Sequence, residues 1–253
     1  MDRLAFTSLG AMNSQSTIRA QISNNLANVA TTGFKESYSL ASQAVKLEGP
    51  GNETRYTSAH GLQDIIKLNP GAVITTGNAM DVVMNDKTVL GVQAQNGEIG
   101  FTRRGDLRVS PTGVIENAAG HLILGEQGPI NVPQGQLVTI SPDGTVYGQI
   151  PNQPDEQPEA LGQLLLRDAS ETPLTRRPDG LFEPLDENLR GADFITGPIP
   201  VSVRSGQLEG SNANPIQAMV QMMDFSRSFE AHTKMLAEIK SVDETGSTMM
   251  RLP

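Results

Sequence analysis

Apolar residues near the N-terminus recur at intervals of three, four or seven positions, at Leu4, Ala11, Ile18, Ile22, Leu26 and Val29. This spacing predicts an amphipathic helix, and about 27 residues of helix would be about 40 Å long. The stripe stops where Thr31 and Thr32 precede Gly33, and we expect Gly33 to end the helix in a left-handed conformation. The segment lacks the charged pairs that would hold so long a helix alone in water, so we expect it to need a partner.

Between about Asn78 and Ser205 the pattern changes to short apolar runs separated by turn residues. In these turns proline sets φ and glycine supplies positive φ: Asn96-Gly97, Pro111-Thr112-Gly113, Pro142-Asp143-Gly144 and Pro178-Asp179-Gly180. The strands expected between the turns are residues 88–92, 107–109, 137–140, 164–166 and 199–203. Turns at this density, without helical periods between them, predict an antiparallel body rather than βαβ units.

The C-terminal segment returns to a helical pattern with clear start signals. Asn214 can cap the helix, and Pro215 suits its first position. Two heptad rows follow, with Met222, Phe229 and Leu236 in one and Phe225, His232 and Ile239 in the other. Helices with narrow apolar seams at the two ends of a chain can pair with each other. Apolar side chains off this seam remain available to neighbouring subunits: Met219, Met223 and Met235.

The chain is therefore expected to belong to the α+β class, with N- and C-terminal helices pairing as a coiled coil and a central antiparallel β-rich domain. Its length of 253 residues allows one large domain or a small domain plus helical extensions. We expect four parts: an N-terminal helical segment (1–35), a connecting extended segment (36–77), the β-rich body (78–205) and a C-terminal helical segment (206–253).

Composition and charge exclude several classes of function. Lys and Arg total 19 against 28 acidic residues, a net charge of −9, so the chain offers no electrostatic footprint for nucleic acid or for an anionic membrane surface. The absence of cysteine excludes disulfides, thiolate nucleophiles and cysteine-bound zinc. No apolar run approaches the ~20 residues of a membrane-spanning helix. Polar residues 13–16 interrupt the N-terminus before a signal-peptide core develops, so we expect a soluble chain without a standard cleaved signal.

Side chains that could support catalysis are scattered along the chain. The histidines lie far apart and lack metal-ligand spacing: His60, His121 and His232. Acidic residues in predicted turns are more typical of solvated loops than of paired glycosidase carboxylates: Asp143, Asp186 and Glu187. The arginine pairs 103–104 and 176–177 fit solvent-facing or interfacial ion-pair donors better than phosphate sites. We therefore expect no enzyme activity, no cofactor, no metal and no small-molecule substrate.

The end of the N-terminal helix is rich in amides, with Asn24, Asn25 and Asn28 followed by Gly33 and the aromatic Phe34. Asn forms helix poorly but hydrogen-bonds well to neighbouring backbone and side chains. Because residues three and four apart share a helix face, the three amides can form one polar strip that fixes the register between subunits. A helix terminus rich in capping residues is the alternative interpretation.

Residues 25–28 (Asn-Leu-Ala-Asn) running to residues 31–35 (Thr-Thr-Gly-Phe-Lys) resemble the N-terminal signature of the flagellar rod and hook protein family. Residues 205–212 (Ser-Gly-Gln-Leu-Glu-Gly-Ser-Asn) are similar to a second signature near the far end of those proteins. Residues 76–82, 101–106 and 111–113 resemble further family elements in the same order, so the resemblance covers nearly the whole chain. The chain departs from the family pattern at residues 84–90, where a Gly-x-Gly-aromatic-Phe element is usual.

This resemblance implies a non-enzymatic structural subunit of the flagellar basal-body rod, the drive shaft that transmits torque from motor to hook. The start and the end of the chain are most similar to the proximal rod type, and the distal rod type is the alternative. A β-rich binding or adhesin module with a dimerising coiled coil is a further alternative, but it leaves both signatures unexplained.

The partners that the resemblance implies are copies of the chain itself, neighbouring rod proteins and the flagellar type III export apparatus, in the periplasm between the inner and outer membranes and without direct membrane insertion. The terminal helices would pair in the inner tube of the axial structure, and the β-rich middle would form its outer layer. The residues expected at subunit interfaces are Ile18, Ile22, Asn24, Asn25, Leu26, Asn28, Gly33, Phe34, Leu208, Glu209, Ser211, Asn212, Met222, Phe225, Phe229, Leu236 and Ile239.

Overall fold

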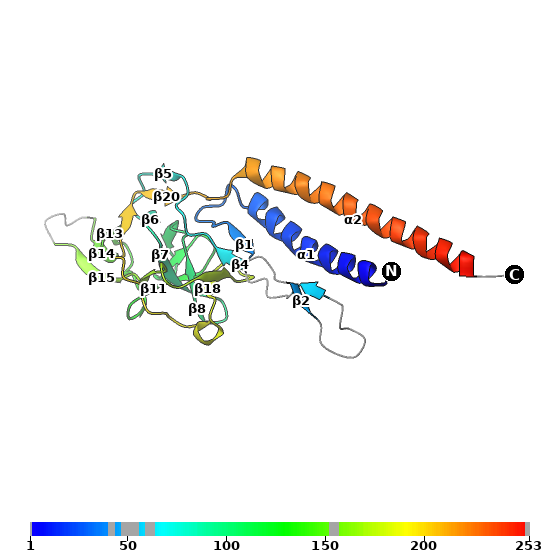
Figure 1. Ribbon diagram of the computed structural model, residues 1–253. Helices are drawn as coiled ribbons and strands as arrows, with labels where there is room; N and C mark the ends of the chain where they lie inside the picture. The colour runs from blue at the N-terminus through cyan, green and yellow to red at the C-terminus, as the bar shows by residue number, and fades with distance from the viewer. Residues whose placement is uncertain (1, 40–43, 47–55, 59–63, 152–156, 251–253) are drawn as a thin grey trace. The chain divides into compact units, whose positions relative to one another are not determined.

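The computed structural model describes residues 2–39, 44–46, 56–58, 64–151 and 157–250 (Figure 1). The chain divides into two compact units, one made of Met1–Ala27, Ser39–Gln63 and Asn214–Pro253, and the other of Asn28–Tyr38 and Asp64–Ala213. The first unit contains two long helices in contact, and the second is built from antiparallel strands. The predicted α+β class is thereby confirmed.

The helical unit consists of α1 (Asp2–Ala27) and α2 (Pro215–Met250), together with the antiparallel pair β2 (Ala44–Lys46) and β3 (Tyr56–Ser58). The two helices run side by side in Figure 1, α1 in blue and α2 from orange to red. The predicted cap is present, because Asn214 Oδ1 accepts the backbone N–H groups of Ile216 at 3.0 Å and Gln217 at 3.2 Å. These bonds satisfy donors that the first turn of a helix otherwise leaves unpaired.

The predicted end of the N-terminal helix requires a correction. Gly33 is left-handed as expected, with φ of +68°, but α1 already ends at Ala27. A turn follows, closed by a 3.1 Å bond from the Thr31 N–H to the Asn28 carbonyl. The reason is that Asn28, Thr31 and Thr32 favour turns over helix, so the chain leaves the helix before Gly33.

The remaining elements alternate with tight turns. They are β1 (Ser37–Ser39), β4 (Asp64–Ile66), β5 (Val73–Thr75), β6 (Val82–Met84), β7 (Thr88–Gln93), β8 (Ile99–Thr102), β9 (Leu107–Val109), β10 (Ile115–Asn117), β11 (Leu122–Gly125), β12 (Gly128–Pro129), β13 (Leu137–Ile140), β14 (Thr145–Gln149), β15 (Glu159–Gln163), β16 (Leu166–Asp168), β17 (Leu174–Arg176), β18 (Phe182–Pro184), the 3₁₀ turn η1 (Glu187–Leu189), β19 (Val203–Ser205) and β20 (Gln207–Glu209).

Within the described residues the largest sheet has 11 strands. Nine of them follow the order β1-β4-β17-β18-β8-β7-β11-β10-β9, with β12 paired to β11 and β16 paired to β7. A separate sheet has the order β13-β14-β15, and two-stranded ladders join β19 to β6 and β20 to β5. Neighbours such as β7 and β8 or β13 and β14 pair antiparallel, which confirms the predicted antiparallel body.

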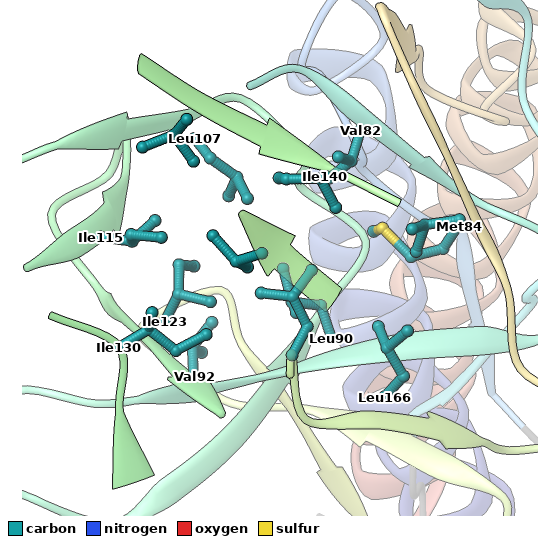
Figure 2. Close-up of a cluster of buried hydrophobic side chains, with 14 of the residues drawn as sticks. Val82, Met84, Leu90, Val92, Leu107, Ile115, Ile123, Ile130, Ile140 and Leu166 are labelled. Atoms are coloured by element: carbon teal, nitrogen blue, oxygen red, sulfur yellow. The ribbon is translucent and has the colours of Figure 1, made fainter. Parts of the chain in front are cut away.

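Two clusters of buried aliphatic and aromatic side chains hold the β-rich unit together. The larger cluster (Figure 2) joins β6, β7, β9, β10, β11, β13 and β16 through Val82, Met84, Leu90, Val92, Leu107, Ile115, Ile123, Ile130, Ile140 and Leu166. The smaller cluster includes Phe101 and Phe194, whose ring centroids lie 4.6 Å apart in an edge-on arrangement. With no Trp in the chain, burial of branched aliphatic side chains supplies most of the hydrophobic stabilisation.

The predicted turns are confirmed, since Gly97, Gly113, Gly144 and Gly180 all have φ between 84° and 86°. Two of the predicted strands are displaced. In the first, Leu164 makes only a single bridge, to Gly125, and β16 begins at Leu166. In the second, expected at residues 199–203, the ladder begins only at Val203, because prolines at 198 and 200 have no backbone N–H to donate.

Candidate functional site

The two signature segments of the chain lie side by side in the β-rich unit. The Gly33 N–H donates to the Glu209 carbonyl at 2.7 Å, and the Asn212 N–H donates to the Phe34 carbonyl at 3.3 Å. The Asn212 side chain strengthens this pairing, because its Oδ1 accepts the Glu36 N–H at 2.6 Å. Residues that the sequence places at opposite ends of the chain therefore bind each other within one molecule.

A buried ion-pair cluster lies beneath this pairing. Glu209 Oε1 contacts Lys35 Nζ at 2.7 Å, and Glu209 Oε2 contacts Arg103 Nη2 at 2.7 Å. The side chains of Lys35, Arg103 and Glu209 are 0%, 1% and 1% exposed. Oε1 also accepts the Gly71 N–H at 2.9 Å. One carboxylate thus compensates two cations in a place that water does not reach, and partners of this kind are what make buried charge tolerable.

Arg103 connects this cluster to the turn between β6 and β7. Its guanidinium donates to the carbonyls of Met84 at 2.9 Å, Asp86 at 2.6 Å and Thr88 at 2.9 Å. Asp86 has a φ of +46°, an uncommon conformation for a residue with a side chain. This turn lies within residues 84–90, where the sequence led us to expect a departure from the family pattern. The guanidinium of Arg103 satisfies three backbone carbonyls there.

The location of Arg103 corrects the expectation that the 103–104 pair is solvent-facing or interfacial. Arg104 does bind Asp106 at a half-buried position, with 2.8 Å between Nε and Oδ1, whereas Arg103 is buried. The available signal was the spacing, because Phe101 and Arg103 are two residues apart and so point to the same face of the chain. Lys35 belongs to the first signature, and nothing in its neighbouring sequence marks it as a buried cation.

Burial lowers the pKa of Lys35 to about 8, and the nearby Arg103 charge lowers it further, against the raising effect of the Glu209 carboxylate. Between about pH 8 and the ordinary value of 10.5, the unfolded chain therefore holds a proton on Lys35 that the folded chain has released. Because the unfolded state binds more protons in this window, the free energy of unfolding rises with pH there.

This linkage gives a testable prediction for Lys35→Met, which removes the titrating group and leaves the Arg103–Glu209 pair intact. The wild-type chain should gain stability relative to the variant from pH 8 to pH 10.5, by up to about 3 kcal/mol. Urea unfolding of both proteins at half-unit pH intervals measures the difference. A difference that stays constant across the window would show that Lys35 titrates alike in both states.

Gly33 and Phe34 are held closely against the same region. A Cβ on Gly33 would lie 2.5 Å from backbone atoms of Arg103 and Arg104, so the close approach depends on glycine. The guanidinium of Arg176 lies over the Phe34 ring, 4.1 Å from its centroid, a geometry typical of cation–π attraction. Phe34 therefore has a cationic partner in its own chain, and its expected place at a subunit interface stays a prediction.

The structure gives the second signature a role inside the molecule. Leu208 pairs with Ile74 in the β20–β5 ladder, and Ser211 Oγ accepts the Ala213 N–H at 3.1 Å. Glu209 was expected at a subunit interface, but its carboxylate is enclosed by its own chain and does not reach the surface. The observed function of these residues is to bind the segment after α1 to the segment before α2.

The predicted seam residues on the two helices differ in how deeply they are buried. On α1, Ile22 is buried and Leu26 is half-buried, whereas Ile18 is exposed. On α2, the half-buried members of the predicted seam are Met222, Phe225, His232, Leu236 and Ile239. Phe229 lies at the margin of the seam, 40% exposed and stacked on Phe225 with 6.0 Å between ring centroids.

The three asparagines do not form the single strip that was expected. Asn25 is buried, Asn24 is exposed, and Asn28 lies beyond the end of α1, where its Oδ1 accepts the Thr31 hydroxyl at 3.1 Å. The physical reason is the early end of the helix, which removes Asn28 from the helical spacing on which the strip depends.

The His, Asp and Glu side chains considered as catalytic or metal-ligating candidates were checked in the described parts of the chain. There, no group of three His, Asp or Glu side chains is placed to hold a metal ion, and no helix is long and apolar enough to cross a membrane. Asp143 and Asp186 bind their own turns, accepting from Thr145 and Asn188. His60 lies outside the described residues.

Comparison with known proteins agrees with the motifs. The family model described as "Flagellar basal body rod FlgEFG protein C-terminal" matches residues 204–249, and the model "Flagellar hook protein FlgE/F/G D1 domain" matches residues 86–148. The flagellar basal-body rod protein FlgF of Salmonella typhimurium is 36% identical over 96% of this chain and 95% of its own length. The corresponding Escherichia coli protein is 35% identical over 100% of this chain and 98% of its own length.

The chain belongs to the FlgF family of flagellar basal-body rod proteins. A rod protein FlgG from Agrobacterium fabrum is less similar, at 28% identity over 99% of both chains, which favours the proximal rod type over the distal one. FlgF-type chains are structural, non-enzymatic rod proteins, and an adhesin module is no longer needed to explain the fold. In this FlgF-type chain Glu209 lies in the matched C-terminal region and Arg103 in the matched D1 region, so the ion-pair cluster joins the two.

Proposed function

We propose that this FlgF-type subunit assembles with copies of itself and with neighbouring rod proteins into the axial drive shaft, in the periplasm between the inner and outer membranes. We further propose that it arrives through the flagellar type III export apparatus. The observation that carries the assembly proposal is an apolar stripe on α2 that α1 leaves uncovered.

The stripe lies on the first turns of α2, at Ile216, Met219, Val220 and Met223, which are between 45% and 73% exposed. These residues follow the spacing i, i+3, i+4, i+7, the pattern of a helix face that packs against another element. Because α1 covers a different face of α2, the stripe is available to a second helix. Contiguous exposed apolar patches are costly in water and mark interaction sites.

In the proposed rod, the stripe packs against terminal helices of adjacent subunits, and the exposed Ile18 and Phe229 make separate contacts beside the seam. The terminal helical segments form the inner part of the shaft, and the β-rich segment forms the outer part. The seam between α1 and α2 stays within one subunit and presents the stripe outward. Torque transmission then depends on helix packing between subunits. Inside each subunit, the buried ion-pair cluster around Glu209 supports the fold.

A double substitution Met219→Asp with Met223→Asp tests this assembly surface. We expect normal export and a folded β-rich unit, but at least about tenfold lower recovery of the subunit in purified basal bodies, because an unpaired charge in a helix–helix contact costs several kcal/mol. Secreted subunit measures export, and swimming in soft agar measures function. Recovery equal to wild type would contradict the proposal.

Two control variants separate the stripe from general effects of charge. Ser241→Asp with Thr245→Asp adds the same two carboxylates to exposed positions of α2, at the same four-residue spacing. Glu187→Ala changes an exposed residue of η1. Both are expected to support near-normal recovery and swimming, and a loss in the first control equal to that of the methionine variant would point to helix charge rather than to the stripe.

A further inference from the structure

A polar contact crosses the apolar seam between α1 and α2. Gln15 Nε2 donates to Ser228 Oγ at 2.6 Å, over a sequence separation of 213 residues. Ser228 and His232 lie four residues apart on α2 and are both half-buried, so they share the face that meets α1. Gln15, Ser228 and His232 form what we name the polar layer of the helix pair.

The polar layer contains enclosed polar atoms that lack hydrogen bonds. Gln15 Oε1 and His232 Nδ1 are both enclosed, and within the described structure neither has a hydrogen-bond partner. Apolar side chains at these positions would avoid the cost of enclosing unpaired polar atoms. A costly polar group inside an apolar seam is characteristic of positions that set helix register rather than stability.

Two contacts define the register. Gln15 lies opposite Ser228, and the Arg19 guanidinium lies 5.9 Å from the Phe225 ring centroid. Residue numbers therefore rise along α1 as they fall along α2, so the helices are antiparallel. Continuing one more turn places Ile22, which is buried, opposite Met222.

We propose that the polar layer selects this register of the α1–α2 pair against a slip of one helical turn. If Gln15 moved opposite Phe225, its carboxamide would lose the Ser228 hydroxyl and face an aromatic ring. The same slip would move Ile22 opposite Ala218, which an apolar seam alone would tolerate. A slip in the other direction brings Gln15 toward His232, another polar group, so the discrimination acts mainly against the first slip. This inference concerns the helix pair alone and does not rest on the proposed contacts between subunits.

The absence of native cysteine makes disulfide trapping a direct test in the full chain. One protein carries Ile22→Cys with Met222→Cys, which reports the observed register, and a second carries Ile22→Cys with Ala218→Cys, which reports the slipped one. Disulfide yields are compared at equilibrium in a glutathione buffer. In the otherwise wild-type background we expect the first pair to exceed the second by at least about tenfold, the fold-change that a lost buried hydrogen bond typically produces.

Ser228→Val and Ser228→Thr form a matched pair, because valine and threonine have nearly the same shape and differ in the hydroxyl. In the valine background we expect the slipped yield to rise about tenfold relative to the observed register, and in the threonine background we expect the wild-type ratio. Gln15→Met keeps the length of the side chain but removes its amide, so it should raise the slipped yield as Ser228→Val does. Equal ratios in the valine and threonine backgrounds, or no register preference in the wild type, would overturn the proposal.

Discussion

Glu209→Gln is expected to lower the free energy of unfolding by about 3–5 kcal/mol, the usual cost of removing one partner from a buried ion pair. The substitution keeps the shape of the side chain but leaves Lys35 and Arg103 enclosed without a counter-charge. Lys35 can release its proton to limit the cost, whereas the guanidinium of Arg103 stays charged. Urea unfolding at pH 7, followed by circular dichroism, measures the loss.

Glu187→Gln is the matched control, because Glu187 is 79% exposed and lies 3.6 Å from Arg190 in a surface pair. Surface pairs of this kind contribute at most about 1 kcal/mol. If the two variants were equally stable, the cluster around Glu209 would not be a major source of stability. Adding Lys35→Met to Glu209→Gln should recover part of the loss, since one of the two uncompensated cations is then removed.

Gly33→Ala is expected to lower the free energy of unfolding by about 3 kcal/mol or more. A side chain in the left-handed region costs about 1–2 kcal/mol, and here φ is +68°. The added Cβ would also lie 2.5 Å from backbone atoms of Arg103 and Arg104, which side-chain rotation cannot relieve. The same denaturation experiment measures the effect, and subunit recovery in basal bodies should fall with it.

Gly77→Ala separates the two contributions to this prediction. Gly77 has a similar φ of +76°, but an added Cβ would meet nothing within 4 Å. Gly77→Ala should therefore lower the free energy of unfolding only by the cost of a left-handed backbone, about 1–2 kcal/mol. Equal losses at the two glycines would mean that the close approach of Gly33 to the backbone of Arg103 and Arg104 is unimportant.

Several elements follow from the sequence because their chemistry is local. Asn214 and Pro215 begin α2 where they were expected to, since a cap and a first-turn proline act on neighbouring backbone groups. The four Gly-containing turns have the predicted positive φ for the same reason. The apolar periodicity of both termini was sufficient to predict two helices in contact, and the order of the motifs was sufficient to identify the family.

Three features could not be predicted from periodicity, because each depends on a competition between local conformations. They are the early end of α1, the displaced strand at residues 199–203 and the separated asparagines. Propensity near a helix terminus competes with turn formation, and a proline removes ladder donors only where a strand would need them. In each case the side-chain pattern includes residues that lie outside the helix or strand that forms.

Only the tertiary structure determines the buried ion-pair cluster. Glu209 meets Lys35 across 174 residues and Arg103 across 106, and nothing in a window around any of the three shows that they will be enclosed together. The polar layer of Gln15 and Ser228 likewise depends on how two helices from opposite ends of the chain align. Caps, turns and apolar stripes are properties of neighbouring residues, whereas the desolvation of a charge depends on every segment that folds around it.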